Sequence, residues 1–448
     1  MGIRNFLSII TGKITITLNR TLFKGGTNFP GRIAMKIKKD ILKTIAKNYK
    51  IIVVTGTNGK TTTTSMIYNI FKENGEKVIT NGSGANLITG IVTTFIKNYK
   101  FFSKNDGYAI IEVDEANLKF FTEYISPEII TITNLFRDQL DRYGEVYTTL
   151  NILIDAIKKS PSSKLILNGD ESLLGDLDLP NEILYYGFNE GLNSNVKVDI
   201  NADAKFCKKC GAMYKYNFIT YNHLGSYYCE SCGFAHPTLK YGVDKVLETT
   251  PSYSDILING KNLVINQPGS YNIYNGICAL AVAMENSISF DVCSKSLSKI
   301  QSAFGRQESL NIDNKEVKII LVKNPAGYNE AINTVMLEKE AISVGFLLND
   351  NYADGTDVSW IWDVNFEQLS TINITSILVG GIRKYDMAIR LKIAGMDENI
   401  FNLCDDYDAL LNSIKNAKSD KVYLLCTYTA MTSLRKYLHE KKYINNLW

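Results

Sequence analysis

The sequence predicts an α/β protein in which helices cover parallel sheets, and three observations support this. Short apolar segments alternate with amphipathic helical segments from residue 51 onward, which is the pattern of strand–helix–strand units. A block at residues 203–237 that is rich in Cys and Tyr interrupts the alternation. A second alternating series follows residue 306, which predicts a separate, smaller C-terminal α/β domain.

Composition and charge narrow the class of protein. The 448 residues are 45% hydrophobic and 21% charged, which is typical of a globular chain. At roughly 150 residues per domain, this length predicts about three domains. The net charge of +3 excludes the positive excess with which proteins wrap nucleic acid, so we expect no nucleic-acid partner. No apolar run reaches the roughly 18 residues of a membrane-spanning helix, and we expect a cytoplasmic protein.

Residues 1–49 are predicted to form a basic N-terminal helical segment. Residues 1–50 hold eleven Lys or Arg and one acid, Asp40. An apolar stripe with the spacing of a helix face runs through Phe6, Ile10, Ile14, Leu18 and Leu22. Such a stripe flanked by bases can lie on an anionic membrane surface, which would place the protein at the inner face of the membrane. The many β-branched residues and the lack of Trp favour the other interpretation, a helix packed on its own domain.

The central domain is predicted at residues 50–309 and the C-terminal domain at residues 310–448. Buried strands of the central domain are expected at residues 51–54, 109–113, 129–133 and 165–167, with helices around residues 66–71, 150–157 and 274–284. Strands of the C-terminal domain are expected at residues 319–322, 344–347, 376–379 and 422–426. Alternating strands and helices predict parallel sheets with helices on both faces.

A glycine-rich loop joins the first of these strands to a helix. It consists of Gly56, Thr57, Asn58, Gly59, Lys60, Thr61 and Thr62. The glycines let backbone N–H groups turn inward around phosphates, and the helix N-terminus adds its positive end. Lys60 can reach the β- and γ-phosphates, and the hydroxyl of Thr61 can ligate Mg²⁺. The loop therefore predicts a nucleotide-phosphate site.

Three acids stand at the carboxyl end of the strand at residues 109–113, namely Glu112, Asp114 and Glu115. Ligands of an open parallel sheet bind at the carboxyl ends of its strands, where this strand and the glycine-rich loop would converge. Carboxylate oxygens are the ligands that Mg²⁺ prefers. Glu112 is therefore the predicted magnesium ligand, and the alternative is that these acids cap the next helix.

Four cysteines form a C-x2-C-x18-C-x2-C pattern, at Cys207, Cys210, Cys229 and Cys232. Each pair can make a turn whose thiolates converge on one ion, and Gly211 and Gly233 permit the turn. Four thiolates leave no open coordination position, so the pattern predicts a structural Zn²⁺. A nucleic-acid ribbon is disfavoured because Lys208, Lys209 and Lys215 are too few bases to follow a phosphate backbone.

The remaining Cys and His residues are assigned no chemistry. The other cysteines, Cys278, Cys293, Cys404 and Cys426, lie in apolar surroundings and are expected to be reduced core residues. His223 and His236 are expected to be ordinary surface or packing residues, because four thiolates suffice for the metal.

Several motifs follow one another in a fixed order. They are the glycine-rich loop, Glu112-Val113-Asp114-Glu115, Thr133-Asn134 with Asp138 and Asp141-Arg142-Tyr143, Asn168-Gly169-Asp170, Tyr271-Asn272-Ile273-Tyr274-Asn275 and Gly305-Arg306. This order resembles the Mur ligase family, whose members phosphorylate a carboxylate with ATP and let an amine attack it. The resemblance, over roughly residues 50–310, implies that Lys60 holds the phosphates and that Thr61 and Glu112 hold Mg²⁺. It also implies that Asn275 contacts adenine and Arg306 the nucleotide phosphates.

The chain departs from the usual Mur ligase pattern in several places. Gln139 stands where the family usually has a metal-binding His, no Lys lies near Ile154 where several members carry a carbamylated one, and Asn324-Pro325 lacks the usual ribose-binding Asp. Only 55 residues precede Gly56, which are too few for the domain that recognises a UDP-linked sugar.

The C-terminal segments 324–330, 354–363 and 380–388 are unlike the acceptor domains of ordinary Mur ligases. Together with the four-cysteine insertion they resemble the MurT family, the ligase-like subunits of lipid II isoglutaminyl synthase. The resemblance implies ATP-dependent amidation of the α-carboxyl of D-glutamate in the stem peptide of lipid II, with ammonia taken from glutamine. The expected fold is thus a Mur ligase-type central domain with an inserted zinc ribbon and a smaller C-terminal α/β domain.

Glutamine hydrolysis requires a Cys nucleophile activated by a His, and none of the three His stands beside a plausible nucleophile. The resemblance implies a GatD-like glutamine amidotransferase partner. It implies that Asp357 of this chain orients the partner's His, with Asp354 as the second choice; a turn or cap role is the alternative for Asp357. Trp360 and Trp362 are expected to face the partner or the core, at least one of them the core.

Two other functions remain open from the sequence. One is a stand-alone Mur-type ligase that joins an amino acid to a carboxylate, which would need an acceptor pocket in residues 310–448. The other is a nucleotide-binding switch whose zinc ribbon contacts nucleic acid.

Overall fold

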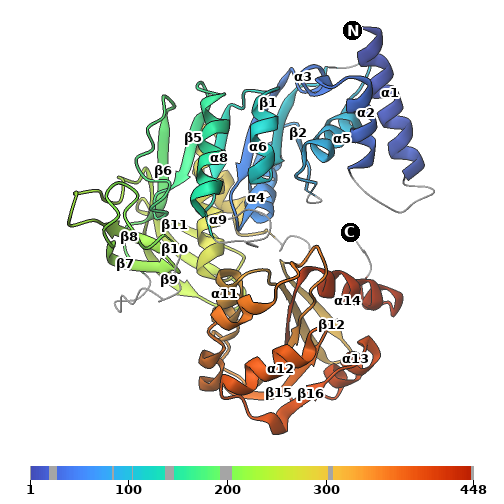
Figure 1. Ribbon diagram of the computed structural model, residues 1–448, viewed down its shortest axis with the longest axis vertical. Coiled ribbons are helices and arrows are strands. Elements are labelled where there is room, and N and C mark those ends of the chain that lie inside the picture. Colours follow the sequence, from blue (N-terminus) through green and yellow to red (C-terminus); the bar gives the residue numbers. More distant parts are fainter. Residues whose placement is uncertain are drawn as a thin grey trace.

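The computed structural model describes residues 2–19, 28–82, 85–102, 104–136, 146–191, 204–300 and 306–444. Figure 1 shows a central α/β domain, helices α1 to α3 at one edge of it, and a second α/β domain below it. Within the described residues, no helix is both long enough and apolar enough to span a bilayer.

The central domain is built on a nine-stranded sheet in the order β11-β10-β9-β6-β5-β4-β1-β3-β2. The strands are β1 (Tyr49–Thr55), β2 (Val78–Thr80), β3 (Gly107–Glu112), β4 (Ile129–Ile132), β5 (Lys164–Asn168), β6 (Ile183–Phe188), β9 (Tyr241–Thr249), β10 (Ser254–Ile258) and β11 (Lys261–Ile265). The predicted parallel arrangement is confirmed from β2 to β9, and β10 and β11 add an antiparallel edge.

Helices cover both faces of this sheet, as predicted. They are α4 (Lys60–Glu73), α9 (Ser270–Glu285) and α10 (Phe290–Leu297) on one face, and α5 (Ile88–Asn98), α6 (Glu115–Thr122) and α8 (Val146–Lys158) on the other. Successive residues of β1 point to opposite faces, so Ile52 packs in the core beneath α4 and α9 while Val53 packs in the core beneath α5 and α8. Both cores are continuous and hold the ends of the strands in place.

The N-terminal helices are α1 (Ile3–Leu18), α2 (Phe29–Ile37) and α3 (Ile41–Ile45). The buried side of α1 consists of Ser8, Ile9, Gly12 and Thr15, and the hydroxyl of Ser8 donates to the carbonyl of Ala34 at 2.8 Å. Helix α1 therefore packs on its own domain, as the favoured interpretation held, but through this side and not through the whole apolar stripe. Phe6, Ile14 and Leu18 are 43%, 54% and 48% exposed, Ile10 is half-buried, and Leu22 lies outside the described residues.

The Cys- and Tyr-rich block forms a hairpin of its own between β6 and β9, as its lack of strand–helix rhythm suggested. Its strands are β7 (Lys215–Tyr221) and β8 (Leu224–Tyr228), which pair only with each other among the described residues. We call the described part of this block, residues 204–237, the ribbon.

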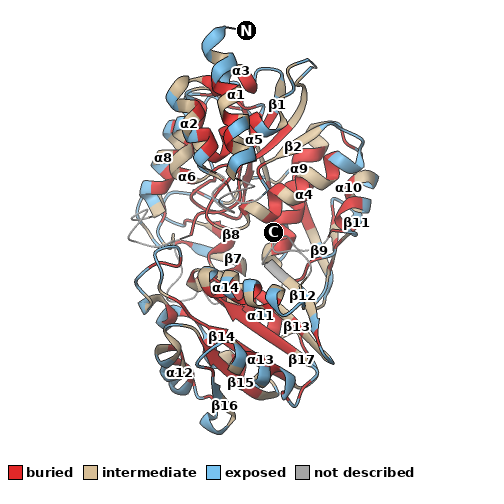
Figure 2. Cartoon of the chain, turned by 90° about the vertical axis from the view of Figure 1, so that its right-hand side faces the viewer, coloured by how far each residue is buried: buried red, intermediate tan, exposed pale blue. Residues whose placement is uncertain are grey.

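The C-terminal domain is a six-stranded sheet in the order β12-β13-β17-β14-β15-β16. Its strands are β12 (Arg306–Ile312), β13 (Lys315–Leu321), β14 (Ile342–Leu347), β15 (Ile374–Gly380), β16 (Phe401–Leu403) and β17 (Lys421–Cys426), buried between helices (Figure 2). Its helices are α11 (Pro325–Val335), α12 (Lys384–Ile393), α13 (Tyr407–Lys415) and α14 (Tyr428–Glu440), with short 3₁₀ helices η2 (Ser359–Asp363), η3 (Phe366–Thr371) and η4 (Glu398–Ile400). The strand β12 already belongs to this sheet, and the division placed at residues 309/310 falls inside it.

The four cysteines outside the ribbon match their prediction. Cys278, Cys293, Cys404 and Cys426 are all buried and none is in a disulfide. They are reduced core residues.

Candidate active site

The sheet reverses its strand order at β1, which pairs with β3 on one side and β4 on the other. Such a switch point leaves a crevice at the carboxyl ends of the strands. Val54 and Glu112 are directly paired across β1 and β3, so the loop after β1 and the acids after β3 meet there, as predicted.

The two glycines of the loop are required by its conformation. Gly56 has φ +116° and Gly59 has φ +84°, values that L side chains rarely adopt. A Cβ atom at Gly56 would lie 2.4 Å from the hydroxyl of Thr133, and one at Gly59 would lie 2.2 Å from Oδ1 of Asn275. The loop is therefore held closely between the end of β4 and the start of α9.

Polar side chains after β4 fix the loop. Oδ1 of Asn134 accepts from the backbone N–H of Asn58 at 2.9 Å, and the hydroxyl of Thr133 donates to the carbonyl of Asn58 at 2.6 Å. The hydroxyl of Thr57 accepts from the backbone N–H of Phe136 at 3.1 Å. The Thr133-Asn134 motif thus shapes the loop directly, while residues 138–143, which include Gln139, lie outside the described part of the chain.

Lys60 opens α4 and turns its side chain back over the loop. Its ammonium group donates to the carbonyls of Gly56 and Thr57, at 2.5 and 3.2 Å, and lies 3.2 Å from Oε2 of Glu115. Both side chains are buried. Burial raises the pKa of Glu115, and the positive charge of Lys60 acts against that rise. Sequence reasoning placed Glu115 at the strand end but missed this ion pair.

Glu112 holds a buried carboxylate oxygen at the carboxyl end of β3. Its side chain is 3% exposed, and Oε1 accepts from Nδ2 of Asn86 at 3.2 Å. Its Oε2 has no hydrogen-bond partner among the described residues. A buried acceptor without a partner is costly, and a hard cation would satisfy it. The capping alternative applies instead to Asp114, whose Oδ1 accepts from the backbone N–H of Ala116 at 3.1 Å at the start of α6.

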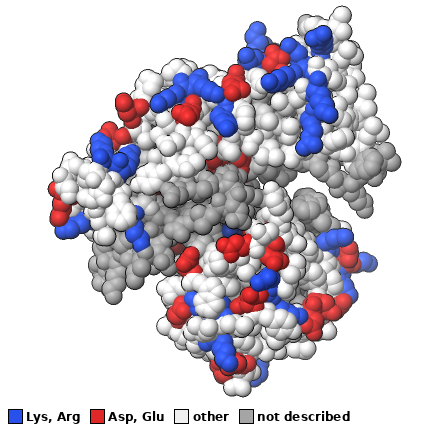
Figure 3. Space-filling view, in the orientation of Figure 1, with Lys and Arg blue, Asp and Glu red and all other residues white. Residues whose placement is uncertain are grey.

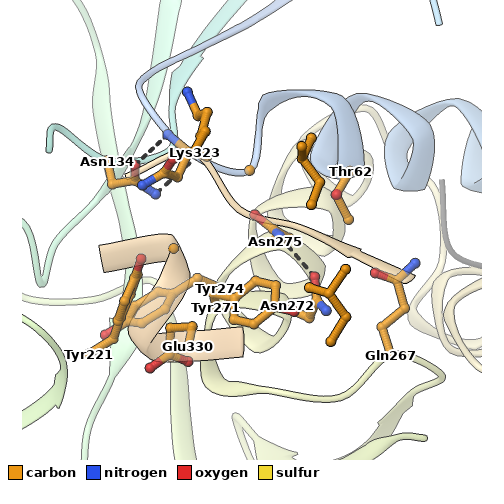
Figure 4. A pocket seen from close by; sticks show the side chains of 15 residues that line it. Thr62, Asn134, Tyr221, Gln267, Tyr271, Asn272, Tyr274, Asn275, Lys323 and Glu330 are labelled. Carbon is orange, nitrogen blue, oxygen red and sulfur yellow. Dashed lines mark hydrogen bonds between the residues drawn. The ribbon is translucent and has the colours of Figure 1, made fainter. Parts of the chain in front are cut away.

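A pocket opens between the loop, the start of α9 and the C-terminal domain (Figure 4). Its lining includes Asn58, Gly59, Thr62, Asn134, Gln267, Tyr271, Asn272, Asn275, Lys323 and Glu330. Asn275 is fixed in it, because Nδ2 donates to Asn272 and Oδ1 accepts from the hydroxyl of Thr63, both at 3.1 Å. The predicted adenine ligand therefore faces the same pocket as the loop.

The C-terminal domain reaches this loop with two side chains that sequence reasoning did not single out for this role. The ammonium group of Lys323 donates to the carbonyl of Thr57 at 3.2 Å, and Nδ2 of Asn324 donates to Oδ1 of Asn58 at 3.2 Å. Their position directly after β13 was the available signal, since strand ends carry the site in this fold class. Arg306 begins β12, and its side chain lies outside the described parts of the structure.

Two buried carboxylates bind the ribbon to the strand ends beside the loop. Nε2 of His223 lies 2.9 Å from Oε2 of Glu171, and both side chains are fully buried. Nε2 of His236 lies 2.8 Å from Oδ1 of Asp170, whose Oδ2 accepts from the hydroxyl of Tyr274 at 2.5 Å. The expectation that both His are ordinary surface or packing residues missed these pairs, although the Asn168-Gly169-Asp170 motif includes Asp170.

The four ribbon cysteines converge as predicted. Their Sγ atoms all lie within 4.8 Å of one another, and the distances are 3.6 Å for Cys207 to Cys232 and 3.5 Å for Cys210 to Cys229. A tetrahedral Zn²⁺ with Zn–S bonds of about 2.3 Å separates its sulfurs by about 3.8 Å. Gly211 and Gly233 have φ +77° and +73°, which confirms their role in the two turns. The cluster is compatible with zinc.

The two aspartates considered for the partner site differ in accessibility. Asp354 is 4% exposed, and its oxygens accept from the backbone N–H of Thr429 at 2.7 Å and from the hydroxyl of Thr429. Asp357 is exposed and accepts from the backbone N–H and the hydroxyl of Ser359, at 2.8 and 2.9 Å. These hydrogen bonds lower the pKa of Asp357. It therefore forms a side-chain turn just before η2, in line with the turn-or-cap alternative, and remains an accessible carboxylate.

The two tryptophans of η2 divide between core and surface. The ring of Trp360 packs 5.9 Å from that of Tyr328 at the edge of the core. Trp362 is 50% exposed, with the guanidinium of Arg390 lying 5.4 Å from its ring. Trp360, which is half-buried against the core, comes nearest to the prediction that at least one of them is a core residue.

Comparisons with known proteins agree with this geometry. Residues 54–283 match the family model of the Mur ligase middle domain, and residues 321–431 match that of the MurT ligase C-terminal domain. In solved structures, the fold is similar to a pseudomurein peptide ligase type C from Methanothermus fervidus, with a TM-score of 0.68 at 22% identity over 90% of this chain and 81% of that one. It is also similar to MurF from Acinetobacter baumannii, with a TM-score of 0.66 at 15% identity over 91% and 80% of the two chains.

Two curated relatives extend along nearly the whole chain. The chain is 40% identical to the lipid II isoglutaminyl synthase (glutamine-hydrolyzing) subunit MurT of Streptococcus pneumoniae strain R6, over 99% of both chains. It is 34% identical to the subunit of the same name from Staphylococcus aureus strain COL, over 91% of this chain and 92% of that one. On these matches and on its Mur ligase fold, the chain belongs to the MurT family, the Mur ligase-like subunits of lipid II isoglutaminyl synthase.

Proposed function

We propose that this chain is the ligase subunit of a glutamine-dependent amidating enzyme. It phosphorylates the α-carboxyl of D-glutamate in the lipid II stem peptide with ATP, and ammonia then converts the acyl phosphate to the amide. The observation that carries the proposal is the juxtaposition of a complete phosphate-binding loop with the buried Oε2 of Glu112, in a chain related to MurT subunits along its whole length. Membership of the Mur ligase family implies ATP and Mg²⁺.

Different residues of the loop have different roles in phosphate binding. The backbone N–H groups at the N-terminus of α4 donate to the phosphates, and Lys60 adds a positive charge. Lys60 is already oriented over the loop by the carbonyls of Gly56 and Thr57. Glu112 and the hydroxyl of Thr61 would hold Mg²⁺, which compensates charge on the transferring phosphoryl group.

The proposed reaction has two steps. An oxygen of the substrate carboxylate attacks the γ-phosphorus of ATP, and ADP leaves. Ammonia then attacks the carbonyl carbon of the acyl phosphate, phosphate leaves with the C–O electron pair, and the nitrogen loses a proton. Lys60 and the loop act on the first step, because that is where charge moves onto the phosphoryl oxygens. Asn275 faces the same pocket and is our proposed adenine contact; Arg306 is the proposed phosphate contact from the second domain.

We propose that a partner supplies the ammonia, and the contacts of two histidines of this chain agree with that. The Nε2 atoms of His223 and His236 pair with Glu171 and Asp170, and the four ribbon cysteines converge on one another. A GatD-like glutaminase would bring its own Cys and His, and an exposed carboxylate of this chain could orient that His. Asp357 is accessible for this role, whereas Asp354 is occupied by Thr429. We therefore choose Asp357.

An apolar surface on α12, a helix in contact with η2, supports docking of the partner on this part of the C-terminal domain. It consists of Ile382, Tyr385, Ile389 and Ile393, which are 55–62% exposed on and just before α12. Arg390 joins this helix to η2, because its side chain donates to the carbonyls of Ile361 and Val364 at 3.2 and 2.7 Å. Exposed apolar patches of this kind are typical of protein interfaces.

The zinc is proposed to be structural. Four thiolates close the coordination shell, and the ribbon that they would hold reaches the strand ends through His223 and His236. The metal would therefore stabilise the wall of the site without touching the substrate.

The test is amidation by the purified chain with ATP, lipid II and labelled ammonium chloride, read by mass spectrometry of the stem peptide. The proposal expects labelled amide at the α-carboxyl of D-glutamate. A stand-alone ligase would attach an amino acid instead, and a nucleotide-binding switch would leave lipid II unchanged; neither alternative is favoured by the family to which the chain belongs.

A further inference from the structure

Helix α1 exposes to solvent the apolar face that the spacing of its hydrophobic residues predicts to be buried. This face is formed by Ile3, Leu7, Ile14 and Leu18, whose spacing of four, seven and four residues places them on one side of the helix. Their exposed fractions are 79%, 49%, 54% and 48%. The opposite side is packed closely. A Cβ atom added at Gly12 would lie 2.8 Å from Cδ1 of Ile96 and 3.6 Å from Cβ of Ala34, so the small residues of α1 fix its orientation.

The exposed face continues onto the loop that follows α5. The ring of Phe6 lies 5.5 Å from that of Phe101 in an edge-to-face contact, and the next residue, Phe102, is fully exposed. Exposed lysines flank these rings at positions 100 and 104. We call Ile3, Phe6, Leu7, Ile14, Leu18, Phe101 and Phe102 the N-terminal apolar surface.

The charge of the N-terminal segment is mainly positive. Residues 1–39 contain eight Lys or Arg and no acid. Residues 51–448 contain 38 Lys or Arg and 45 acids, which leaves them at −7. Figure 3 shows Lys and Arg gathered over the N-terminal helices, and Arg4, Arg32 and Lys36 on α1 and α2 are exposed.

We propose that the N-terminal apolar surface docks this chain onto an anionic lipid bilayer, with α1 lying in the plane of the interface. An apolar stripe as long as the helix, aromatic rings beside lysines, and surrounding cations are the features by which helices bind at membrane surfaces. The match of charge favours anionic lipid over a neutral surface. The inference goes beyond the amidation chemistry, since it concerns a surface on which Lys60, Glu112 and Asp357 do not lie.

The experiment is co-sedimentation of the purified full chain with vesicles, without ATP or lipid II. Vesicles of phosphatidylglycerol mixed with phosphatidylcholine should pellet the protein, and vesicles of phosphatidylcholine alone or high salt should reduce binding, because salt screens the lysines and arginines. The double variant Leu7→Ser/Ile14→Ser should bind the vesicles at least about tenfold more weakly, since two half-exposed apolar side chains no longer enter the lipid. Arg4→Glu/Lys36→Glu should weaken binding while leaving the apolar stripe intact.

The matched control is Ile389→Ser/Ile393→Ser, which removes equally exposed apolar residues from α12 and should leave vesicle binding unchanged. Circular dichroism and thermal unfolding check that each variant is folded. Lack of binding by the wild-type chain, or equal loss in the α1 and α12 variants, would overturn the proposal. So would a concentration-dependent dimer that Leu7→Ser/Ile14→Ser abolishes in the absence of vesicle binding, because the surface would then serve a second copy of the chain.

Discussion

The ammonium group of Lys60 lies 3.2 Å from the carboxylate of Glu115, and both side chains are buried where the glycine-rich loop meets the end of β3. Lys60 is the residue on which phosphate binding depends in the proposed mechanism, and its charge is balanced inside the protein by Glu115. The ion pair therefore stabilises the loop. Glu115 also competes with phosphate for the ammonium group of Lys60.

Glu115→Gln should destabilise the protein because it leaves the buried charge of Lys60 without its partner. Removing one member of a buried ion pair costs about 3–5 kcal/mol in the free energy of unfolding. Urea denaturation measures this loss. The neighbouring variant Asp114→Ala removes only a helix cap and should cost about 1 kcal/mol; equal effects of the two substitutions would argue against the ion pair.

Lys60→Ala and Glu112→Ala should each abolish ATP-dependent amidation. Glu112→Ala should leave the fold and the zinc content intact, whereas Lys60→Ala should also lower stability because it leaves buried Glu115 without its partner. Each removes charge that compensates or positions the transferring phosphoryl group, and losses of at least about a hundredfold in kcat are expected. Asp114→Ala, at the same strand end, is the control and should retain most activity. Normal turnover of either variant at saturating Mg²⁺ would remove that residue from the phosphate site.

Metal analysis should find one zinc per chain, and Cys229→Ser should lower stability rather than chemistry, because a closed four-thiolate site contributes to folding. Elemental analysis and thermal unfolding with and without a chelator test this. Ser231→Ala, which lies between two of the cysteines, should change neither quantity. A wild-type protein that is free of zinc yet fully stable would contradict the assignment.

Glu285, at the end of α9, should make stability depend on pH. Burial acts to raise its pKa, but hydrogen bonds from Lys164, Lys240 and Tyr241 lower the pKa to about 2. Because this value lies below the unfolded pKa of about 4.3, the stabilisation is present above that pH and is lost as the pH falls toward about 2. Glu285→Gln should flatten the acid decline in unfolding free energy. Glu182→Gln, whose exposed carboxylate also pairs with Lys164, should not.

The elements that the sequence predicted well are those defined by a pattern of residues within one short segment. The glycine-rich loop carries its own signature, and the pairing of Val54 with Glu112 follows from two apolar strands that end at the same edge of a sheet. The four cysteines converge because their spacing leaves room for a hairpin. In each case the residues that define the feature are close in sequence or lie at equivalent strand ends.

The features that sequence missed depend on contacts between distant segments. Periodicity identified the apolar stripe of α1 but could not tell that Gly12 and Ser8 would face α5 and α2 instead. The pairing of His223 with Glu171 joins residues from the ribbon and the strand ends, and nothing in their spacing predicts it. Lys323 likewise reaches Thr57 from another domain.

Asp357→Asn should suppress glutamine-dependent amidation and spare the ammonia-dependent reaction. The proposed carboxylate serves the partner's His, and free ammonia bypasses the glutaminase. Both activities are measured on the complex with the partner. Asp354→Asn should instead reduce both routes together by loss of stability, since Asp354 holds Thr429. Equal failure of Asp357→Asn with ammonium and with glutamine would place Asp357 in the ligase site or the fold.

The central claim is that this chain activates the stem-peptide carboxyl by phosphorylation, and isotope transfer tests it most directly. Lipid II whose D-glutamate α-carboxyl carries heavy oxygen is incubated with the chain, ATP and ammonium chloride, and the released phosphate is analysed by mass spectrometry. The account predicts one heavy oxygen in each phosphate formed together with amide, because the C–O bond of an acyl phosphate breaks when ammonia attacks. Amide formation accompanied by unlabelled phosphate would contradict it.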